Sequence, residues 1–213
     1  MLIKVCGITE KTDASKLKGK VDILGFIFYP PSQRNAFNLD KEIIKKYGKD
    51  FQTVGVFVDS PLEEVTSICE ERDITTIQLH GKENLEYIEL LKKKGYKIIK
   101  AISISTEDDV TLLQNKINLY QRKADILLFD TAGRKKGGNG YKFDWNIFKK
   151  LIIRSPFFLS GGISIEDVKS INEISKKSSV MIGVDINSRF EISPGEKDIN
   201  QINEFTVKII GRE

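Results

Sequence analysis

Short uninterrupted runs of apolar residues recur along the whole chain, each bounded by glycine or polar residues and followed by a stretch with helical spacing. Strands that are buried on both faces carry apolar residues at nearly every position, whereas strands with one solvated face alternate. The runs therefore predict the strands of a parallel sheet. They are Leu2–Cys6, Ile23–Phe28, Val54–Val58, Thr76–Leu79, Ile98–Ile102, Ile126–Phe129, Phe157–Leu159 and Val180–Val184.

Several helices between these runs are predicted from residues that satisfy the free N–H groups of a first turn. Ser60–Glu63 combines a capping serine, a proline at the first helical position and a capping-box glutamate. Ser164–Asp167 and Asp198–Gln201 repeat this pattern before the last two helices. The last helix carries one apolar face, made of Ile199, Ile202, Phe205 and Ile209.

Eight strand–helix units without a low-complexity linker predict an α/β fold, a closed (β/α)₈ TIM barrel that forms a single catalytic domain over residues 1–213. The chain is somewhat shorter than the roughly 250 residues typical of this fold. An open doubly wound sheet is the alternative. A Gly-x-Gly-x-x-Gly turn after the first strand would favour it, but here the single Gly7 follows Cys6.

Composition narrows the class of function. The 34 basic and 30 acidic residues give a net charge of +4, spread over short lysine clusters instead of one basic stripe, so we expect no nucleic-acid partner. Two cysteines and one histidine provide neither a disulfide framework nor a zinc site. We expect a cytoplasmic protein with no membrane segment, because the chain starts directly in its first strand without an apolar leader.

In a parallel barrel, chemistry collects at the carboxyl ends of the strands. The residues that follow or end the predicted strands are a thiol, a guanidinium, an imidazole, two carboxylates and two turns rich in glycine or amide groups. They are Cys6, Arg34, His80, Asp130, Gly161-Gly162, Asp185 and Asn187-Ser188. We expect these side chains to meet at one mouth.

Seven segments in this order make the chain resemble the phosphoribosylanthranilate isomerase family, which serves tryptophan biosynthesis. Each segment alone is a weak signal, but their ordered combination over nearly the whole chain is specific. They are Lys4–Thr9, Gly25–Arg34, Val54–Val58, Gln78–Gly81, Gly137–Gly140 with Phe143–Trp145, Leu159–Gly162, and Val184–Asp185 with Pro194–Asp198.

The resemblance implies an Amadori rearrangement of N-(5-phosphoribosyl)anthranilate to the open-chain aminoketose. By similarity, Asp130 is the general acid that protonates the furanose ring oxygen, and Cys6 is the general base that removes the C2′ proton. A free thiol is mostly protonated at neutral pH, so we expect a nearby cation to lower the pKa of Cys6.

The resemblance also implies how the substrate is held. Arg34 would bind the anthranilate carboxylate, because a guanidinium offers a planar fork that a carboxylate accepts twice. Gly161-Gly162 and Asn187-Ser188 would bind the phosphate, and Asp185 would face the ribose hydroxyls or the amine. No metal and no cofactor is implied, and the only partners are the small phosphorylated substrate and, transiently, other tryptophan-pathway enzymes.

The chain departs from the family pattern after the last strand, where Asn187 replaces a serine and Arg189 replaces a glycine. Asn187 keeps a hydrogen-bond donor, so we expect phosphate binding to survive. Arg189 would distort the backbone if the glycine requires a positive φ; the alternative is that it adds a cation near the phosphate. The glycine- and lysine-rich segment 131–140 is expected to serve as a lid over Asp130.

Other interpretations stay open on the sequence. The aminoaldose isomerase of histidine biosynthesis has a related barrel but a carboxylate as its base, and Cys6 argues against it. A catalytically silent barrel that binds a phosphometabolite would need neither Cys6 nor Asp130. His80 is predicted to face the mouth without an assigned role, and Cys69 is expected to pack in the core, since it shares a helical face with Leu62, Val65 and Ile68.

Overall fold

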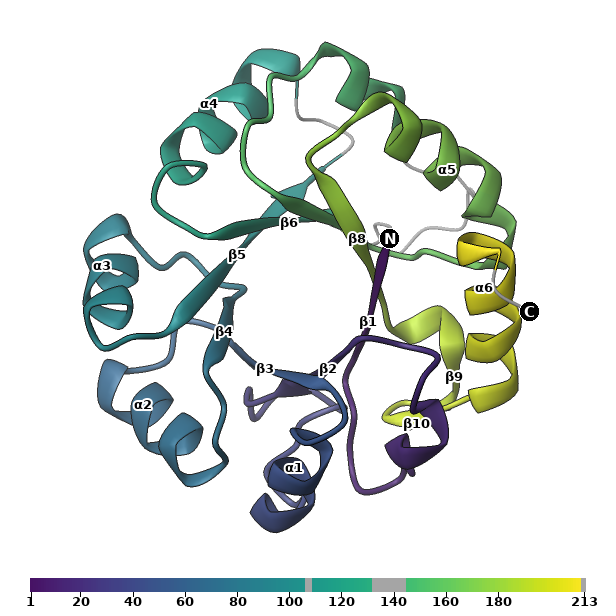
Figure 1. Cartoon of the computed structure of the whole chain (residues 1–213). Helices are drawn as coiled ribbons and strands as arrows, with labels where there is room; N and C mark the ends of the chain where they lie inside the picture. The colour runs from purple at the N-terminus through teal and green to yellow at the C-terminus, as the bar shows by residue number, and fades with distance from the viewer. Residues whose placement is uncertain (106–108, 132–144, 212–213) are drawn as a thin grey trace.

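The computed structural model describes residues 1–105, 109–131 and 145–211, and its centre is a closed barrel of eight parallel strands in sequence order (Figure 1). The prediction of a (β/α)₈ barrel is confirmed. The strands are β1 (Leu2–Cys6), β2 (Ile23–Ile27), β3 (Gln52–Phe57), β4 (Thr76–Leu79), β5 (Lys97–Ile104), β6 (Ile126–Thr131), β7 (Phe157–Ser160) and β8 (Met181–Ile186).

Helices surround the barrel on its outer side (Figure 1). They are α1 (Lys41–Tyr47), α2 (Leu62–Glu71), α3 (Leu85–Lys93), α4 (Val110–Tyr120), α5 (Val168–Lys177) and α6 (Ile199–Ile210). Among the described residues, the first and sixth units carry the short 3₁₀ turns η1 (Ala14–Leu17) and η2 (Trp145–Lys150) in place of an α-helix. The eight predicted units are therefore present, two of them in this reduced form.

Two apolar layers explain why the chain closes on itself. An inner cluster fills the barrel and includes Ile23, Val56, Ile99 and Phe158, while a larger outer cluster joins the strands to the helices. Because successive side chains of a strand point to opposite faces, a strand that contributes to both clusters must be apolar at nearly every position. This is the uninterrupted pattern of the sequence.

Several strand ends differ from the predicted runs by one or two residues, and two differences bear on the predictions for Asp185 and Ser60. The last strand begins at Met181 and runs to Ile186, so Asp185 lies within β8 and not after it. Helix α2 begins at Leu62 with Pro61 at its N-cap and makes no side-chain cap bond, so Ser60 does not cap it. The carbonyl of Ser60 instead accepts a hydrogen bond of 2.8 Å from the Tyr87 hydroxyl.

The other predicted helix starts are confirmed. Ser164 and Asp167 form a reciprocal capping box at η3 (Ile165–Asp167), which leads directly into α5. Asp198 caps α6 by accepting a bond of 3.0 Å from the N–H of Gln201. On the predicted apolar face of α6, Ile202, Phe205 and Ile209 are buried.

A short antiparallel pair that the sequence analysis did not predict lies between β8 and α6. It consists of β9 (Glu191–Ser193) and β10 (Glu196–Lys197), preceded by the 3₁₀ turn η4 (Ser188–Phe190). The hydroxyls of Thr9 and Thr12 donate to the carbonyl of Gly195 at 2.8 and 2.9 Å. These bonds fix the pair against the loop that follows β1.

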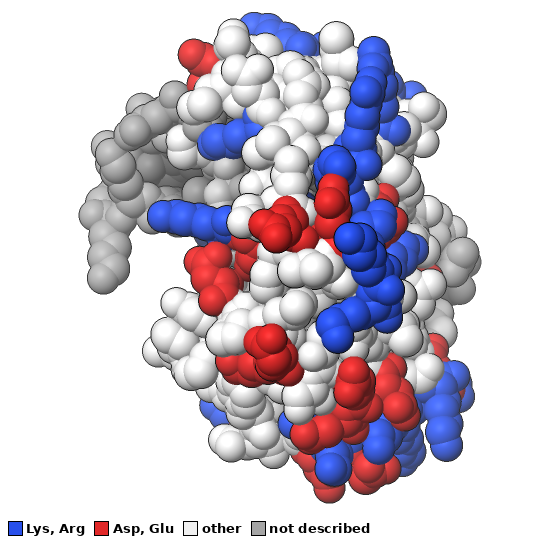
Figure 2. Space-filling model, turned by 90° about the vertical axis from the view of Figure 1, so that its left-hand side faces the viewer, with Lys and Arg blue, Asp and Glu red and all other residues white. Residues whose placement is uncertain are grey.

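The outer surface carries both signs of charge, and in Figure 2 lysine or arginine and aspartate or glutamate side chains adjoin one another on the face shown. None of the described helices has the length and hydropathy of a membrane-spanning segment. The predicted lid at 131–140 lies outside the described residues beyond Thr131.

Candidate active site

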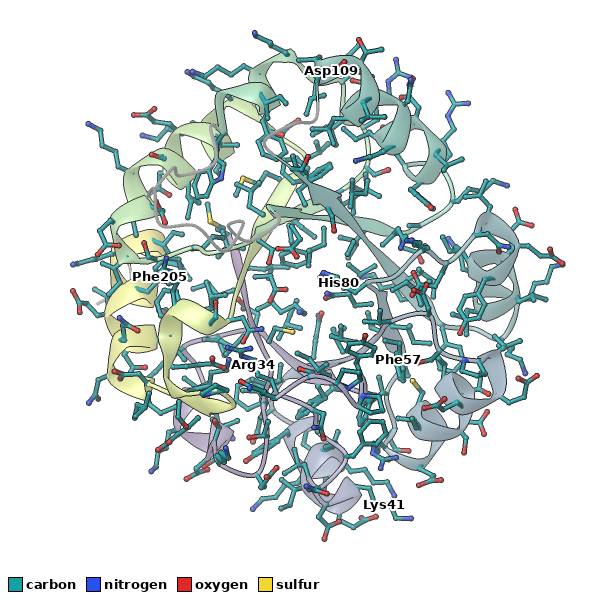
Figure 3. The ribbon with its side chains drawn as sticks, turned by 180° about the vertical axis from the view of Figure 1, so that it is seen from behind. Arg34, Lys41, Phe57, His80, Asp109 and Phe205 are labelled. Atoms are coloured by element: carbon teal, nitrogen blue, oxygen red, sulfur yellow. The ribbon has the colours of Figure 1, made fainter. Side chains whose placement is uncertain are left out.

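One cavity at the carboxyl ends of the strands brings together all the residues that the sequence analysis placed at the mouth. The eight predicted catalytic and substrate-binding residues all line it, and His80 lines it as well. In Figure 3, His80 points into the opening of the barrel and Arg34 lies at its rim, whereas Lys41 and Asp109 lie at the periphery. The eight residues are Cys6, Arg34, Asp130, Gly161, Gly162, Asp185, Asn187 and Ser188.

Cys6 ends β1 inside the barrel, with only 4% of its surface exposed. Burial raises the pKa of the thiol, and the opposing attraction of the cations on Lys4 and Lys197 offsets this only in part. Asp185 adds to the rise because a second negative charge disfavours the thiolate. The predicted nearby cation is therefore present, but the expected net lowering of the pKa is wrong because burial dominates.

Asp130 of β6 lies at the end of a hydrogen-bonded chain of two side chains that come from β4 and from the residue after it. The amide Nε2 of Gln78 donates to Nδ1 of His80 at 2.9 Å, and Nε2 of His80 contacts Oδ2 of Asp130 at 3.1 Å. Since Nδ1 accepts, the ring proton sits on Nε2 and is donated to the carboxylate. The histidine thus orients Asp130 at the mouth.

A buried ion pair supports the loop that carries His80. Nζ of Lys100 donates to Glu83 Oε2 at 2.7 Å and to the carbonyl of Gly81 at 2.6 Å. Both side chains are only 2% exposed. The carboxylate of Glu83 also accepts from the N–H groups of Gly81 and Asp59 at 3.0 and 3.1 Å. This network fixes the backbone immediately after the histidine.

Arg34 comes from the loop after β2, and Glu191 holds it. Its Nε donates to both oxygens of Glu191 at 2.9 Å, and its Nη2 lies 2.7 Å from Oε2. Glu191 also accepts a bond of 2.7 Å from Nζ of Lys197, which donates to Oδ1 of Asn187 at 2.7 Å as well. These bonds lower the pKa of Glu191 although burial opposes them. One carboxylate thus bridges two cations, of which Arg34 lines the cavity and Lys197 is fully buried.

Gly7 lets these groups approach the end of β1. Its φ is +77°, and a Cβ there would lie 2.9 Å from Asn187 Oδ1 and 3.1 Å from Arg34 Cδ. A side chain at this position would therefore be strained and would displace two predicted substrate-binding residues.

The residues predicted to bind phosphate lie on the turns after β7 and β8. Gly161 and Gly162 have φ values of 92° and 63°, a conformation that favours glycine. Ser188 opens the turn η4, and Arg189 within it has no positive φ, so the glycine-to-arginine departure introduces no strain. Ser188 and Arg189 are exposed and line the cavity beside Asn187.

Four residues of the site escaped the sequence analysis: Lys4, Gln78, Glu191 and Lys197. Lys4, Gln78 and Lys197 lie inside segments that carried the resemblance, and Glu191 lies two residues after Arg189, where the chain departs from the family pattern. Lys4 precedes Cys6 by two residues, so both share one face of a strand. That spacing was a usable signal, whereas the pairing of Glu191 with Lys197 depends on the unpredicted β9–β10 pair. Within the described part of the chain, no three His, Cys, Asp or Glu residues cluster as metal ligands would.

Comparison with known proteins agrees with this arrangement. The family profile described as N-(5'phosphoribosyl)anthranilate (PRA) isomerase matches residues 3–208. The N-(5'-phosphoribosyl)anthranilate isomerase of Parabacteroides distasonis is 35% identical over 213 residues, covering 99% of this chain and 94% of that protein.

Solved structures give the same result. The phosphoribosyl anthranilate isomerase of Thermus thermophilus superposes with a TM-score of 0.79 at 27% identity, covering 99% of both chains. A phosphoribosyl anthranilate isomerase in complex with reduced 1-(o-carboxyphenylamino)-1-deoxyribulose 5-phosphate gives 0.78 at 26% identity, covering 100% of both. With the barrel, the mouth residues and the profile match in agreement, the chain belongs to the N-(5'-phosphoribosyl)anthranilate isomerase family.

Proposed function

We propose that this barrel is one catalytic domain that isomerises N-(5-phosphoribosyl)anthranilate to 1-(2-carboxyphenylamino)-1-deoxyribulose 5-phosphate in tryptophan biosynthesis, with Asp130 as general acid and Cys6 as general base. The observation that carries the proposal is that Cys6 on β1 and Asp130 on β6 line one cavity together with Arg34. Family membership supports the same substrate. The chemistry consists of proton transfers, so these two side chains suffice for it without a cofactor.

The acid step uses the geometry around Asp130. His80 engages Oδ2, and we propose that Oδ1 carries the proton. Transfer of this proton to the furanose ring oxygen breaks the bond between C1′ and that oxygen. The amine lone pair then forms an iminium at C1′. The carboxylate that remains accepts the imidazole N–H of His80, which stabilises the charge left on Asp130.

The base step uses the thiolate of Cys6. It removes the proton from C2′ of the iminium, the electron pair of that bond neutralises the iminium, and an enolamine forms. In the tautomerisation the C2′ hydroxyl loses its proton and C1′ gains one, which gives the ketone at C2′. Because burial raises the pKa of Cys6, the reactive thiolate is a minor form at neutral pH.

Substrate binding is assigned to the rest of the mouth. Arg34 binds the anthranilate carboxylate with the guanidinium that Glu191 orients. Gly161-Gly162 and Asn187-Ser188 bind the phosphate. Asp185 binds a ribose hydroxyl or the substrate amine, because its Oδ1 is buried without a hydrogen-bond partner among the described residues and therefore needs a donor.

The experiment that tests the proposed function is turnover of two substrates by the purified chain. Freshly generated phosphoribosylanthranilate should lose its anthranilate fluorescence and yield the aminoketose, identified by chromatography. The phosphorylated aminoaldose of histidine biosynthesis should remain unchanged. Binding of phosphoribosylanthranilate without turnover would favour a silent barrel, and turnover of the second substrate alone would favour the histidine-pathway activity.

A further inference from the structure

Lys4 is a fully buried lysine inside the barrel, with 0% of its surface exposed. An ammonium group in an apolar interior is costly unless it is paired. Its Nζ donates to Oδ2 of Asp185 at 2.9 Å. Asp185 is itself 4% exposed, so the ion pair is almost completely removed from water.

The strand register places Lys4 beside both Asp185 and Cys6. Lys4 lies opposite Asp185 across the β1–β8 ladder, and it shares the inner face of β1 with Cys6, two residues further on. Cys6 lies opposite Gly25 in β2. A Cβ on Gly25 would be 2.9 Å from Cys6 Sγ and 3.0 Å from Lys4 Nζ. The sulfur and the ammonium group therefore share the space that the missing side chain of Gly25 leaves.

Lys4 lies one layer deeper in the barrel than the reacting groups. Cys6 and Asp185 line the mouth cavity, whereas Lys4 precedes Cys6 on β1 and has no exposed surface. It therefore acts on a bound molecule only through these two side chains.

We propose that Lys4 is a positioning residue that stabilises the thiolate of Cys6 and holds the carboxylate of Asp185 so that its unpartnered Oδ1 faces the substrate. The proposal rests on the proposed function, because it explains how a buried thiol can serve as its base. Two effects of opposite sign act on Cys6: the cation of Lys4 favours the thiolate, and the anion of Asp185 disfavours it.

The other charged groups near Cys6 do not take over the role that we assign to Lys4. Lys197 of β10 is a second cation that favours the thiolate, but its Nζ is paired with Glu191. Asp130 of β6 and His80 after β4 act electrostatically on Asp185 from across the mouth. Lys4 is the cation that shares the Gly25 space with the sulfur.

Alkylation of Cys6 by iodoacetamide tests the proposal without any turnover. The rate is measured against pH in a Cys69→Ala background, so that one thiol reacts. Lys4→Met should raise the pKa read from this profile and slow alkylation at a fixed pH by about threefold per unit of pKa, because a tenfold smaller thiolate fraction is partly offset by a more nucleophilic thiolate. Asp185→Asn should lower the pKa and speed alkylation.

The opposite signs separate this role from a merely structural one. If Lys4 only held the fold together, Lys4→Met would loosen the mouth and Cys6 would react faster. Alkylation of Lys4→Met at or above the parent rate would therefore overturn the proposal. The control Lys92→Met removes an exposed lysine paired with Asp125 and should leave the profile unchanged.

A double variant covers the case in which Lys4→Met alone does not fold. Lys4→Met combined with Asp185→Asn removes both charges and leaves no unpaired carboxylate in the interior. It should be alkylated more slowly than Asp185→Asn alone, and an equal or faster rate would reject the role of Lys4. Since the probe is iodoacetamide, a failure of the proposed isomerase activity would appear only in the turnover assay.

Discussion

Arg34 is held by Glu191 through contacts of 2.9 and 2.7 Å that join the loop after β2 to the start of β9. Arg34 is 25% exposed, whereas Glu191 is 4% exposed and also pairs with the fully buried Nζ of Lys197 at 2.7 Å. One carboxylate thus fixes a guanidinium that faces the cavity and neutralises an ammonium group beneath it.

Removal of this carboxylate should destabilise the protein. In Glu191→Ala, the buried ammonium group of Lys197 loses its counter-charge, and we expect the free energy of unfolding in urea to fall by about 3–5 kcal/mol. The matched control is Glu89→Ala, which removes the partner of Lys123 in an ion pair whose side chains are 47% and 44% exposed, and should cost less than about 1 kcal/mol. Equal losses in the two variants would contradict this assignment.

Gly7→Ala should impair substrate binding as well as stability. The φ of +77° costs a residue with a Cβ about 1–2 kcal/mol, and the new methyl group would displace Arg34 and Asn187. We expect KM for phosphoribosylanthranilate to rise about tenfold to a hundredfold, the effect of losing a charged hydrogen bond of about 1.5–3 kcal/mol.

Gly19→Ala is the control for the backbone term alone. Gly19 has a similar φ of +75°, but a Cβ there meets nothing within 4 Å. Gly19→Ala should lower the free energy of unfolding in urea by about 1–2 kcal/mol, the cost of the positive φ alone, and should keep the parent KM. A parent-like KM in Gly7→Ala would show that the contacts of its Cβ with Arg34 and Asn187 do not matter for binding.

Stability should decline in alkaline solution because of Cys69. Burial raises the pKa of its thiol to about 12, whereas an unfolded thiol titrates near 8.5. Above about pH 8.5 the unfolded chain loses a proton that the folded chain keeps, so the free energy of unfolding falls as pH rises toward 12. This thiol should account for about 2 kcal/mol of the loss between pH 7 and pH 10.

Urea unfolding of the parent and Cys69→Ala at both pH values measures this term. The comparison uses only the change with pH, so the cavity left by the substitution cancels. Cys6 and Tyr87, whose pKa values are also raised, are present in both proteins. An identical pH-induced loss in the two proteins would show that Cys69 does not titrate as described.

The sequence predicts the barrel because burial on both faces makes each strand apolar throughout. The same topology explains why the residues of the mouth could be predicted from the sequence. Parallel strands end at one rim, so Cys6, Asp130 and Arg34 meet there although they are far apart in the chain. The prediction for Ser60 was wrong because a cap must directly precede the first helical residue, and Pro61 takes that place.

The pairings within the mouth were beyond the sequence pattern. Whether Lys4 faces Asp185 depends on the exact β1–β8 register, and the contact of Glu191 with Arg34 depends on how the β9–β10 pair folds back. From sequence alone, a lysine beside an apolar strand position is expected to be exposed to solvent, because lysine is rarely buried without a partner carboxylate. The pKa of Cys6 likewise depends on the balance of burial against two cations, which only the three-dimensional arrangement determines.

The central claim, that Cys6 and Asp130 are the acid–base pair, is tested most directly by the initial rate of anthranilate fluorescence loss with freshly generated phosphoribosylanthranilate. Cys6→Ala and Asp130→Asn should each slow turnover by about 10²–10⁴-fold. Cys69→Ala, which changes a buried thiol outside the mouth, should keep the parent rate. Turnover of Cys6→Ala or Asp130→Asn within a few-fold of the parent would contradict the assigned roles.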